Sequence, residues 1–263
     1  MYLKSNNCYT NSMYFIISPA KKMRYQEYIE ITTTQPLFID KANYLVTKLN
    51  KLSLNEIKTI FKCNDNIALK SYNQYQNFHQ LLTTPAIFCF DGIQYTYMGA
   101  KIFTNDEYHY LQDHLFIISG LYGLLRPLDE IKPYRLDFEI NFSFDSNQNL
   151  YDFWSSSLHD YLFKNDDIVI NLSSSEYSKS ISKFLSNKDK FITIYFYEQE
   201  NDKLVEKGVY CKMARGAMVR YIAENRISDI EKIKQFNQLN YKYDENLSTN
   251  DKIVFIRKTK KIK

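Results

Sequence analysis

The amino-acid sequence predicts an α/β fold of the mixed α+β type, a single domain in which helices flank a mixed β-sheet. Short apolar runs of strand length alternate along the chain with longer segments that have helical periodicity. The chain has 263 residues, 44% of them hydrophobic, which is enough to enclose a sizeable core. No linker rich in glycine, serine or proline divides the chain, and it contains no internal repeat.

The first part of the chain is predicted to contain one strand followed by several helices. Residues 13–17 form a short apolar strand that ends at Ser18. Ser53 and Glu56 have the spacing of a capping box, which predicts that a helix begins beside them. The predicted helices cover residues 40–50, 54–62 and 65–80. After them we expect a short buried segment at 86–90, a turn at Asp91-Gly92 and an extended stretch at 93–98.

The middle of the chain contains a second capping box, formed by Thr104 and Glu107, which opens a helix toward Asp113. Residues 115–119 are a continuous apolar run and are predicted to form a strand. Weak alternation of apolar and polar residues predicts a further strand at 135–142. The two strands would bracket the segment that is richest in glycine and arginine.

Strands and helices continue to alternate in the last part of the chain. An amphipathic helix at 150–163 precedes a strand at 167–172 and a helix at 175–185. Strands at 191–198 and 204–213 are candidates for a hairpin across residues 200–202. The predicted order ends with a helix at 214–227, a short helix capped between Ser228 and Glu231, and a strand at 252–257.

We predict a single domain at residues 13–257, with a polar extension at each end. Residues 1–12 lack the apolar core of a signal peptide and are predicted to be disordered. Residues 258–263 form a basic tail, which is either a solvated end or a loose arm on phosphates. No apolar run approaches the about 20 residues that a membrane span requires, so we expect no membrane contact.

The cysteines and the net charge restrict the class of protein further. The four cysteines are far apart and contain no C-x-x-C pair, which argues against a disulfide framework and against a cysteine-built zinc or iron–sulfur site. Reduced thiols fit a cytoplasmic location, and Cys89 is predicted to be buried in the apolar run A-I-F-C-F. The formal net charge of +4 is below that of a domain whose whole surface grips DNA, so a nucleic-acid contact would be a local patch.

Residues 117–135 carry glycine and arginine at the highest density in the chain. The apolar run breaks at Gly120 and Gly123, and Arg126 and Arg135 follow beside turns that contain proline. Glycine allows backbone amides to approach another group closely, and the planar guanidinium of arginine suits phosphate or carboxylate. The pattern favours an anion site for a nucleic-acid phosphate. The alternative is a core strand that leads into an ordered loop.

The segment G-L-Y-G at 120–123 has three interpretations. It is part of a helix-hairpin-helix-like element whose amides meet the DNA backbone, a backbone clamp similar to the G-x-x-G loop of a KH module, or only a tight connection. The strand-like run at 116–118 argues against a regular helix before the turn.

Polar side chains follow three of the predicted strands. In open sheets, ligands gather outside the carboxyl ends of parallel strands. If these three strands are parallel, the polar clusters share one cleft. The clusters are Ser18 with Lys21, Tyr122 with Arg126 and Arg135, and residues 173–177.

Arg215 is predicted to open the helix at 214–227. A cation at a helix N-terminus opposes the macrodipole by roughly 0.3–1 kcal/mol, so an anion bound there would favour both the dipole and the arginine. Arg226 lies on the same helix face about three turns later, and Arg220 is rotated by roughly 140°. The alternative for these arginines is a salt bridge to a carboxylate such as Glu224.

The candidate catalytic residues are Ser18, Lys21, Glu176 and Tyr177. A lysine near a serine can activate it as a nucleophile, and Glu176 and Tyr177 could act as acid and base. The four histidines are scattered, and neither a 2-His-1-carboxylate iron site, a Rossmann fingerprint nor a P-loop can be assembled. We therefore expect no metal ligands and no cofactor.

Nine short motifs occur in order between Met13 and about Arg257. They are I-S-P-A-K at 17–21, Y-Q-N-F around Phe78, P-A-I-F at 85–88, S-G-L-Y-G-L-L-R-P-L-D at 119–129, P-Y-R-L at 133–136, N-L-Y-D-F-W at 149–154, N-L-S-S-S-E-Y at 171–177, A-R-G-A-M-V-R-Y-I at 214–222 and E-N-R at 224–226. In this order they resemble the bacterial peroxide-stress YaaA family. The chain departs from the family pattern at residues 91–94, at Lys212-Met213 and at Ser178.

The resemblance implies a fold particular to the family, DNA binding, and a part in limiting iron-driven damage during peroxide stress. It also favours the helix-hairpin-helix-like interpretation of G-L-Y-G. We predict a cytoplasmic protein that binds duplex or structured DNA through backbone or structure, because no recognition-helix pattern is present. The expected nucleic-acid contacts are Lys21, Lys22, Gly120, Tyr122, Gly123, Arg126, Arg135, Arg215 and Arg220.

The alternative hypothesis is an enzyme that acts on a nucleotide or another phosphate-bearing small ligand in the same basic cleft. The shape of the cleft distinguishes the two hypotheses. A long open groove with dispersed lysine and arginine favours DNA, whereas a closed pocket with converging carboxylate, lysine and arginine favours catalysis.

Overall fold

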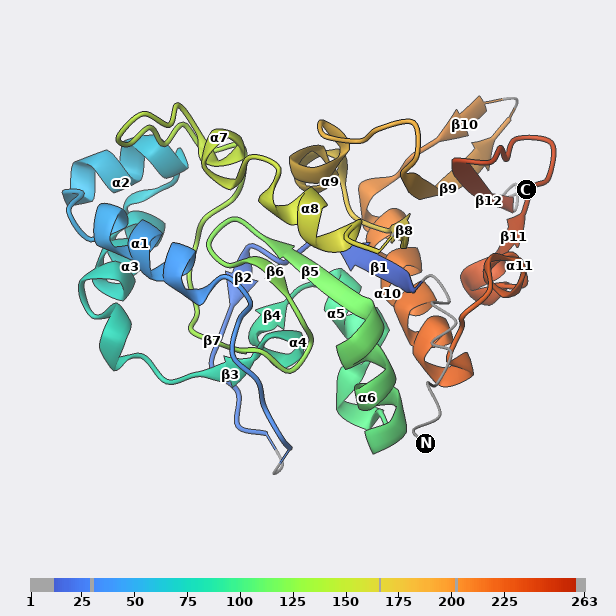
Figure 1. Cartoon of the computed structure of the whole chain (residues 1–263), viewed down its shortest axis with the longest axis horizontal. Helices are drawn as coiled ribbons and strands as arrows, with labels where there is room; N and C mark the ends of the chain where they lie inside the picture. The colour runs from blue at the N-terminus through green and yellow to red at the C-terminus, as the bar shows by residue number, and fades with distance from the viewer. Residues whose placement is uncertain (1–11, 29–30, 166, 202, 259–263) are drawn as a thin grey trace, which may run out of the picture.

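A mixed eight-stranded β-sheet forms the centre of the molecule (Figure 1). The computed structural model describes residues 12–28, 31–165, 167–201 and 203–258. In order across the sheet, the strands are β11 (Tyr241–Tyr243), β12 (Lys252–Lys258), β9 (Lys190–Glu200), β8 (Ile168–Asn171), β1 (Met13–Ile17), β5 (Leu115–Ser119) and β6 (Gly123–Leu125), with β10 (Lys203–Val205) also paired to β9.

The strands in the middle of the sheet are parallel. β12, β9, β8, β1 and β5 run in one direction, while β6, β10 and β11 are antiparallel to their neighbours. Phe15 of β1 lies between Leu115 of β5 and Ile170 of β8 in the register. Every residue of β5 is buried, because helices cover both faces, and this explains its continuous apolar run. The carboxyl ends of β1, β5 and β8 therefore share one edge, as the proposed common cleft requires.

Helices lie on both sides of these strands, with α8 (Ser157–Leu162) and α9 (Ser175–Ser182) on one side and α5 (Ile93–Met98), α6 (Asn105–His114) and α10 (Gly208–Asn225) on the other (Figure 1). Figure 1 also shows α1 (Ile39–Leu49), α2 (Leu54–Phe61) and α3 (Asp65–Gln76) grouped at one end of the molecule. The remaining α-helices of the described chain are α4 (Ala86–Cys89), α7 (Leu150–Trp154) and α11 (Ile230–Ile233), and short 3-10 helices lie at Phe78–Gln80, Ala100–Ile102 and Gln238–Asn240. The remaining strands form two pairs, β2 (Lys22–Met23) with β4 (Phe90–Asp91) and β3 (Thr84–Pro85) with β7 (Glu130–Ile131).

Both predicted capping boxes are confirmed. The Glu56 amide donates to the Ser53 hydroxyl at 3.3 Å, and the Ser53 amide donates to the Glu56 carboxylate at 2.8 Å, so α2 begins at the next residue. Thr104 and Glu107 make the same reciprocal pair at the start of α6. These helix starts depend on residues only three positions apart, which explains why the sequence predicts them well.

The stretch at 93–98 is helical, and the prediction that it is extended was wrong. Gly92 is the N-cap of α5, and Gly99 ends the helix with a φ of 65°. The helix packs against α10 so closely that a Cβ atom on Gly216 would lie 2.1 Å from the carbonyl oxygen of Gln94. This tertiary contact outweighs the strand preference of the isoleucine, threonine and tyrosines in the segment.

Residues 135–142 form an irregular segment rather than the predicted strand. Leu136, Phe138 and Phe142 are buried, and so is Asp137 between the first two, so the weak alternation in the sequence reflects packing of a loop against the core. The backbone amide of Phe138 donates to the carboxylate of Glu176 at 3.1 Å instead of to a neighbouring strand. Periodicity alone does not distinguish a strand from a loop that is packed on one side.

The predicted hairpin is confirmed by the antiparallel pairing of β10 with β9, but its second strand ends at Val205. Residues 208–213, which we expected to continue that strand, are the first turns of α10. Cys211 and Ala214 are buried three residues apart, as on one face of a helix. The sequence fits the period of a strand and the period of a helix almost equally well, and packing of that face decides in favour of the helix.

The helix predicted at 150–163 is divided into α7 and α8 at Ser155, which has a φ of 46°. Trp154 ends α7 and is fully buried, and its indole nitrogen donates to the carbonyl oxygen of Gly120 at 2.9 Å. This long-range hydrogen bond fixes the end of α7 against the core, and the chain turns at the next residue.

The G-L-Y-G segment joins β5 to β6 as a tight turn inside the core, which is the third of its interpretations. A Cβ atom on Gly120 would lie 2.2 Å from the carbonyl oxygen of Leu136. Gly123 has a φ of 74°, and a Cβ atom there would lie 2.7 Å from the ring of Trp154. Glycine is required here because other parts of the protein approach closely, and strands rather than helices flank the turn.

The predictions for the two ends fall almost entirely outside the described residues. Of the extension at 1–12 only Ser12 is described, and of the tail at 258–263 only Lys258. Within the described part of the chain, no helix has both the length and the apolar character that crossing a membrane would need.

Candidate functional site

A pocket of about 420 Å³ opens where the carboxyl ends of β1 and β8 meet the starts of α5 and α9. Residues 18–22 and 91–95 form two of its walls, and Ser174, Glu176 and Tyr177 form a third. Lys212 and Arg215 of α10 complete the lining. The polar clusters that follow β1 and β8 in the sequence therefore do meet in one cleft.

Hydrogen bonds around Ser18 tie three elements together at the base of the pocket. The Ser18 hydroxyl accepts the Ser174 backbone amide at 2.9 Å and lies 3.3 Å from the Ser174 hydroxyl. The Ser18 carbonyl oxygen accepts the side chains of Gln94 at 3.2 Å and Tyr95 at 3.0 Å. Ser18 therefore holds the end of β1, the start of α9 and α5 in a fixed relation, and its hydroxyl bonds to Ser174 rather than to Lys21.

Carboxylates and a phenol form the wall beside α9. The Tyr177 hydroxyl donates to Asp137 at 3.1 Å, and the Lys21 ammonium lies 3.4 Å from the other oxygen of Asp137. Burial, reinforced by the charge of Asp137, raises the pKa of the Glu176 carboxyl above its ordinary value. The same two causes raise the pKa of the Tyr177 phenol strongly, so Tyr177 is a hydrogen-bond donor and not a base. Burial therefore shifts both groups toward their protonated forms.

The rim of the pocket carries exposed cations that have acidic neighbours. Lys22 lies 2.7 Å from Asp91, and Arg24 lies 3.6 Å from the same carboxylate. The hydrogen bond from Lys22, followed by the charge of Arg24, lowers the pKa of Asp91. Side chains of Lys21 and Lys22 are 64% and 74% exposed, so both ammonium groups face solvent at the entrance.

Arg215 stands on α10 at the wall of the pocket. Its helix begins at Gly208, so Arg215 lies in the helix interior, and the prediction that it opens the helix was wrong. The macrodipole argument therefore does not apply to it. Its Nε atom is buried and has no hydrogen-bond partner, and no carboxylate of the described residues lies within salt-bridge distance of the guanidinium. Desolvation lowers the pKa of this guanidinium, which indicates a poorly compensated cation.

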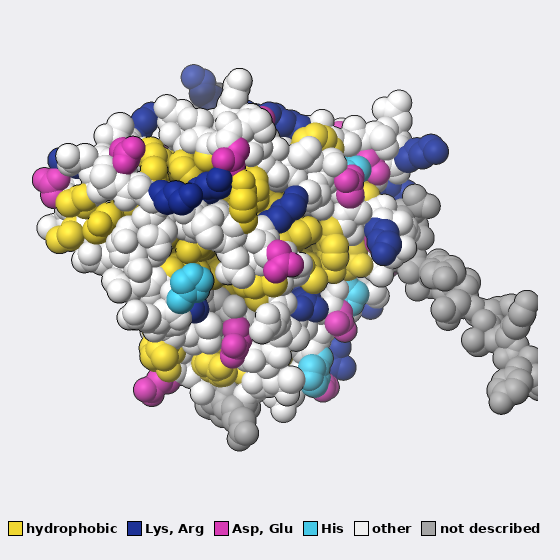
Figure 2. All heavy atoms as spheres, turned by 60° about the vertical axis from the view of Figure 1, so that its left-hand side comes forward, with side chains coloured by type: hydrophobic (Ala, Val, Ile, Leu, Met, Phe, Trp, Pro, Cys, Tyr) yellow, Lys and Arg dark blue, Asp and Glu magenta, His cyan; other side chains and the backbone are white. Residues whose placement is uncertain are grey.

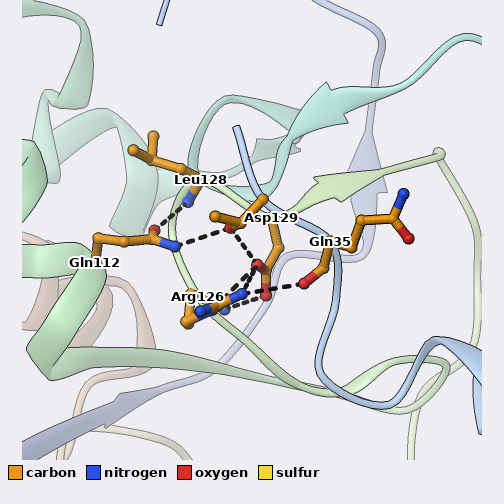
Figure 3. A network of polar contacts seen from close by, with 6 residues as sticks. Gln35, Gln112, Arg126, Leu128 and Asp129 are labelled. Atoms are coloured by element: carbon orange, nitrogen blue, oxygen red, sulfur yellow. Dashed lines mark hydrogen bonds and ion pairs between the residues drawn. The ribbon is translucent and has the colours of Figure 1, made fainter. Parts of the chain in front are cut away.

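Arg126 is placed elsewhere, in a polar network with protein partners (Figure 3). Its guanidinium donates to the Asp129 carboxylate at 3.0 and 3.2 Å and to the Gln35 carbonyl oxygen at 3.1 Å. Thr34 also donates to Asp129, at 2.6 Å, and the Asp129 side chain is fully buried. The arginine and aspartate of R-P-L-D therefore hold a turn together and do not line the pocket.

The other predicted contact residues are also dispersed. Tyr122 is 3% exposed, and its hydroxyl accepts the Lys132 amide at 3.2 Å. Gly120 and Gly123 are buried in the turn after β5. Arg220 pairs with Glu224 at 2.7 Å, the alternative given for it above. Arg135 is half-buried, and the part of the chain that the structure describes gives it no ion pair.

Three residues of the pocket region were missed by the sequence reasoning. Asp91 and Gln94 lie in a segment that was expected to be a turn and an extended stretch, and Asp137 lies in the segment that was expected to be a strand. The departures from the family pattern were the available signal. Residues 91–94 and Lys212 both line the pocket.

A metal centre has no obvious donor set in the described part of the chain, because no group of three or more His, Cys, Asp or Glu side chains there could hold an ion. Cys63, Cys89 and Cys211 are free thiols, whereas Cys8 lies outside the described residues. Cys89 is buried as predicted, and burial raises the pKa of its thiol to about 12. That thiol is therefore protonated and shielded at neutral pH.

Known proteins match this chain over most of the described residues. A protein-family model described as peroxide stress protein YaaA matches residues 13–247. A UPF0246 protein of Lachnoclostridium phytofermentans is 42% identical over 248 residues, which are 93% of this chain and 96% of the relative. A UPF0246 protein of Agathobacter rectalis is 42% identical over 249 residues, 94% of this chain and 99% of the relative. One of Ligilactobacillus salivarius is 41% identical over 247 residues, 93% and 100% respectively.

Proposed function

We propose, from the premise that this chain belongs to the peroxide stress protein YaaA family, that it binds DNA through phosphates at the mouth of the pocket. One observation carries the proposal. Lys21, Lys22 and Lys212, which come from distant parts of the chain, meet at a single entrance and are exposed there. Clustered ammonium groups neutralise phosphates and release counterions, which drives association without selecting a base sequence.

The acidic neighbours of these lysines do not prevent such a contact. Lys21 and Lys22 pair with Asp137 and Asp91, but both ammonium groups remain largely exposed. Because the ammonium groups are exposed, each can reach a DNA phosphate while it stays beside its carboxylate. The carboxylates keep the lysines extended at the rim when DNA is absent.

A contact made by these few lysines would cover only a small area of the DNA. On the face shown in Figure 2, basic side chains are interspersed with acidic ones and do not form one broad patch. The formal net charge of +4 agrees with that distribution. We therefore expect weak, salt-sensitive binding that depends on few residues.

The same contact gives a route to the family's role in peroxide stress. Ferrous ions are among the counterions that gather on DNA phosphates, where their reaction with peroxide generates radicals beside the strand. Lysines that occupy those phosphates displace the counterions. We propose that the protein limits iron-dependent damage in this way. In a plasmid-nicking assay with ferrous iron and peroxide, the wild type should slow nicking, and the triple variant Lys21→Gln, Lys22→Gln, Lys212→Gln should not.

The binding test is a fluorescence-anisotropy titration of a hairpin-closed duplex over a salt series. The plot of log affinity against log salt should be shallower for the triple lysine variant than for the wild type, by about 2–3 in slope, because each lost phosphate contact removes about 0.9. Lys58→Gln is the matched control, since Lys58 is an exposed lysine paired with Asp65 on α2 and α3. Absence of binding at low salt, or an unchanged slope in the triple variant, would refute the proposal.

A further inference from the structure

Arg215 lines the pocket and has no partner there. The proposed DNA contact through the rim lysines gives this arginine no role. The Nε atom of Arg215 is inaccessible to solvent and makes no hydrogen bond. The residue as a whole is half-buried, and the described residues give its guanidinium neither a hydrogen bond nor an ion pair. Partial removal of a cation from water is unfavourable unless an opposite charge compensates. Folding therefore maintains an uncompensated cation beside an open cavity, an arrangement that an anion inside the cavity would complete.

A second set of donors faces the same cavity. Ser174 is the N-cap of α9 and lines the pocket, and the first turn of a helix leaves backbone amides without intrahelical partners. Ser174 donates its own amide to Ser18, whereas the amides of Ser175 and Glu176 have no acceptor among the described residues. Free amides at a helix N-terminus and a guanidinium suit phosphate, which accepts several hydrogen bonds at once.

The size of the cavity selects the kind of phosphate. A volume of about 420 Å³ lies within the roughly 300–1,000 Å³ range of small-ligand pockets. A phosphate within a continuous DNA strand carries a sugar on each side, so it reaches the rim but not the inner wall. A terminal phosphate has only one such neighbour. Pro19, Ala20 and Ile93 give the remaining wall an apolar surface for the group that carries it.

We propose that the pocket binds a phosphate monoester, the terminal phosphate of a nucleotide, through Arg215 and the first turn of α9. The inference rests on the proposed function only in taking phosphate as the ligand of this site. Burial and the charge of Asp137 raise the pKa of the Glu176 carboxyl, which reduces its repulsion of such a ligand. Free nucleotides and the phosphorylated ends of DNA both carry this group.

The first experiment is isothermal titration calorimetry of the full-length chain with adenosine 5′-monophosphate and with adenosine, in phosphate-free buffer. The monophosphate should bind, and adenosine should bind about tenfold more weakly or not at all, because adenosine lacks the group that makes the charged hydrogen bonds. Arg215→Met should weaken binding of the monophosphate about tenfold or more. Arg215→Lys keeps the charge but loses the planar guanidinium, so its affinity for the monophosphate should lie between those of the wild type and Arg215→Met.

The matched control is Arg226→Met. Arg226 ends the same helix, is 59% exposed and pairs with Asp106, away from the pocket. It should leave the affinity for the monophosphate within about twofold of the wild type. Equal affinity for adenosine and its monophosphate would overturn the inference. So would wild-type affinity for the monophosphate in Arg215→Met and Arg215→Lys variants that circular dichroism shows to be folded.

A second arm separates the two sources of the phosphate. Single-stranded oligonucleotides with a 5′-phosphate or a 5′-hydroxyl are titrated against the wild type and Arg215→Met. A preference for the phosphorylated end that Arg215→Met abolishes identifies DNA ends as a source, and binding of the monophosphate alone identifies free nucleotides; both support the pocket. Hairpin-closed duplex has no terminal phosphate, so loss of its binding contradicts only the proposed function.

Discussion

Arg126 in the turn segment at 117–135 and Arg215 in the pocket have opposite environments. Arg126 in the turn segment has a buried carboxylate and a carbonyl oxygen as partners, all supplied by the protein. Arg215 in the pocket has neither. The turn segment has the denser pattern of glycine and arginine, yet its Arg126 guanidinium and Asp129 carboxylate already satisfy each other. A donor that the fold leaves unsatisfied beside a cavity is the better indicator of a binding site.

The largest expected effect comes from breaking the turn segment's ion pair. Asp129→Ala should lower the free energy of unfolding by about 3–5 kcal/mol, because it leaves a partly buried guanidinium without its carboxylate and removes the acceptor of the Thr34 hydroxyl. Urea unfolding monitored by circular dichroism measures the change.

The control for that variant is Asp106→Ala, which removes an exposed partner of Arg226. Its effect should stay below about 1 kcal/mol, as for other exposed ion pairs. Similar losses in the two variants would show that the network of Figure 3 is no more important to stability than a surface contact.

A smaller effect, of opposite sign, is expected in the pocket. Arg215→Met should leave the free energy of unfolding unchanged or raise it by about 1 kcal/mol, since it replaces an uncompensated cation by an apolar side chain of similar helix propensity. Urea unfolding in phosphate-free buffer provides the measurement. A loss of more than about 1 kcal/mol would mean that the protein itself compensates Arg215 and that the contrast between the two regions is false.

The smallest expected effect is a pH dependence at Glu176. Because burial raises the pKa of this carboxyl above its ordinary value of 4.5, the unfolded chain releases the proton at a lower pH than the folded chain does. Stability therefore falls as pH rises from the ordinary pKa through the raised one. Across that window the wild type should lose stability relative to Glu176→Gln, and below it the difference should stay constant.

Urea unfolding of both proteins at a series of pH values tests this sign. Glu245→Gln, which alters an exposed carboxylate, serves as the control and should show no such window. A difference between wild type and Glu176→Gln that grows in the opposite direction would place Glu176 among the carboxylates that the fold stabilises in their charged form.

The site was predictable in part. The clusters after β1 and β8 lie together, as the rule for parallel strands predicted, and bring Ser18, Lys21 and Glu176 into one pocket. Arg126 follows β5 in the sequence but is held away from the pocket by Asp129. Asp91 could not be placed from the sequence, because its position depends on the pairing of β2 with β4. Pairing between distant segments leaves little trace in local residue patterns.

The sequence by itself determined the buried strands and the two helix starts that have capping boxes, whereas the short helix predicted to be capped from Ser228 is capped by Asp229. Each of these features depends on residues within a few positions of one another, such as Ser53 with Glu56 or the apolar run of β5. Tertiary structure decided that residues 93–98 are helical and which arginine is paired. Arg126 finds a partner at Gln35, 91 positions away, whereas Arg215 finds none in the described chain. A spacing of three or four residues can indicate partners such as Asp129 for Arg126 and Glu224 for Arg220. The lack of a partner for Arg215 among the described residues depends on groups that only folding could bring to it.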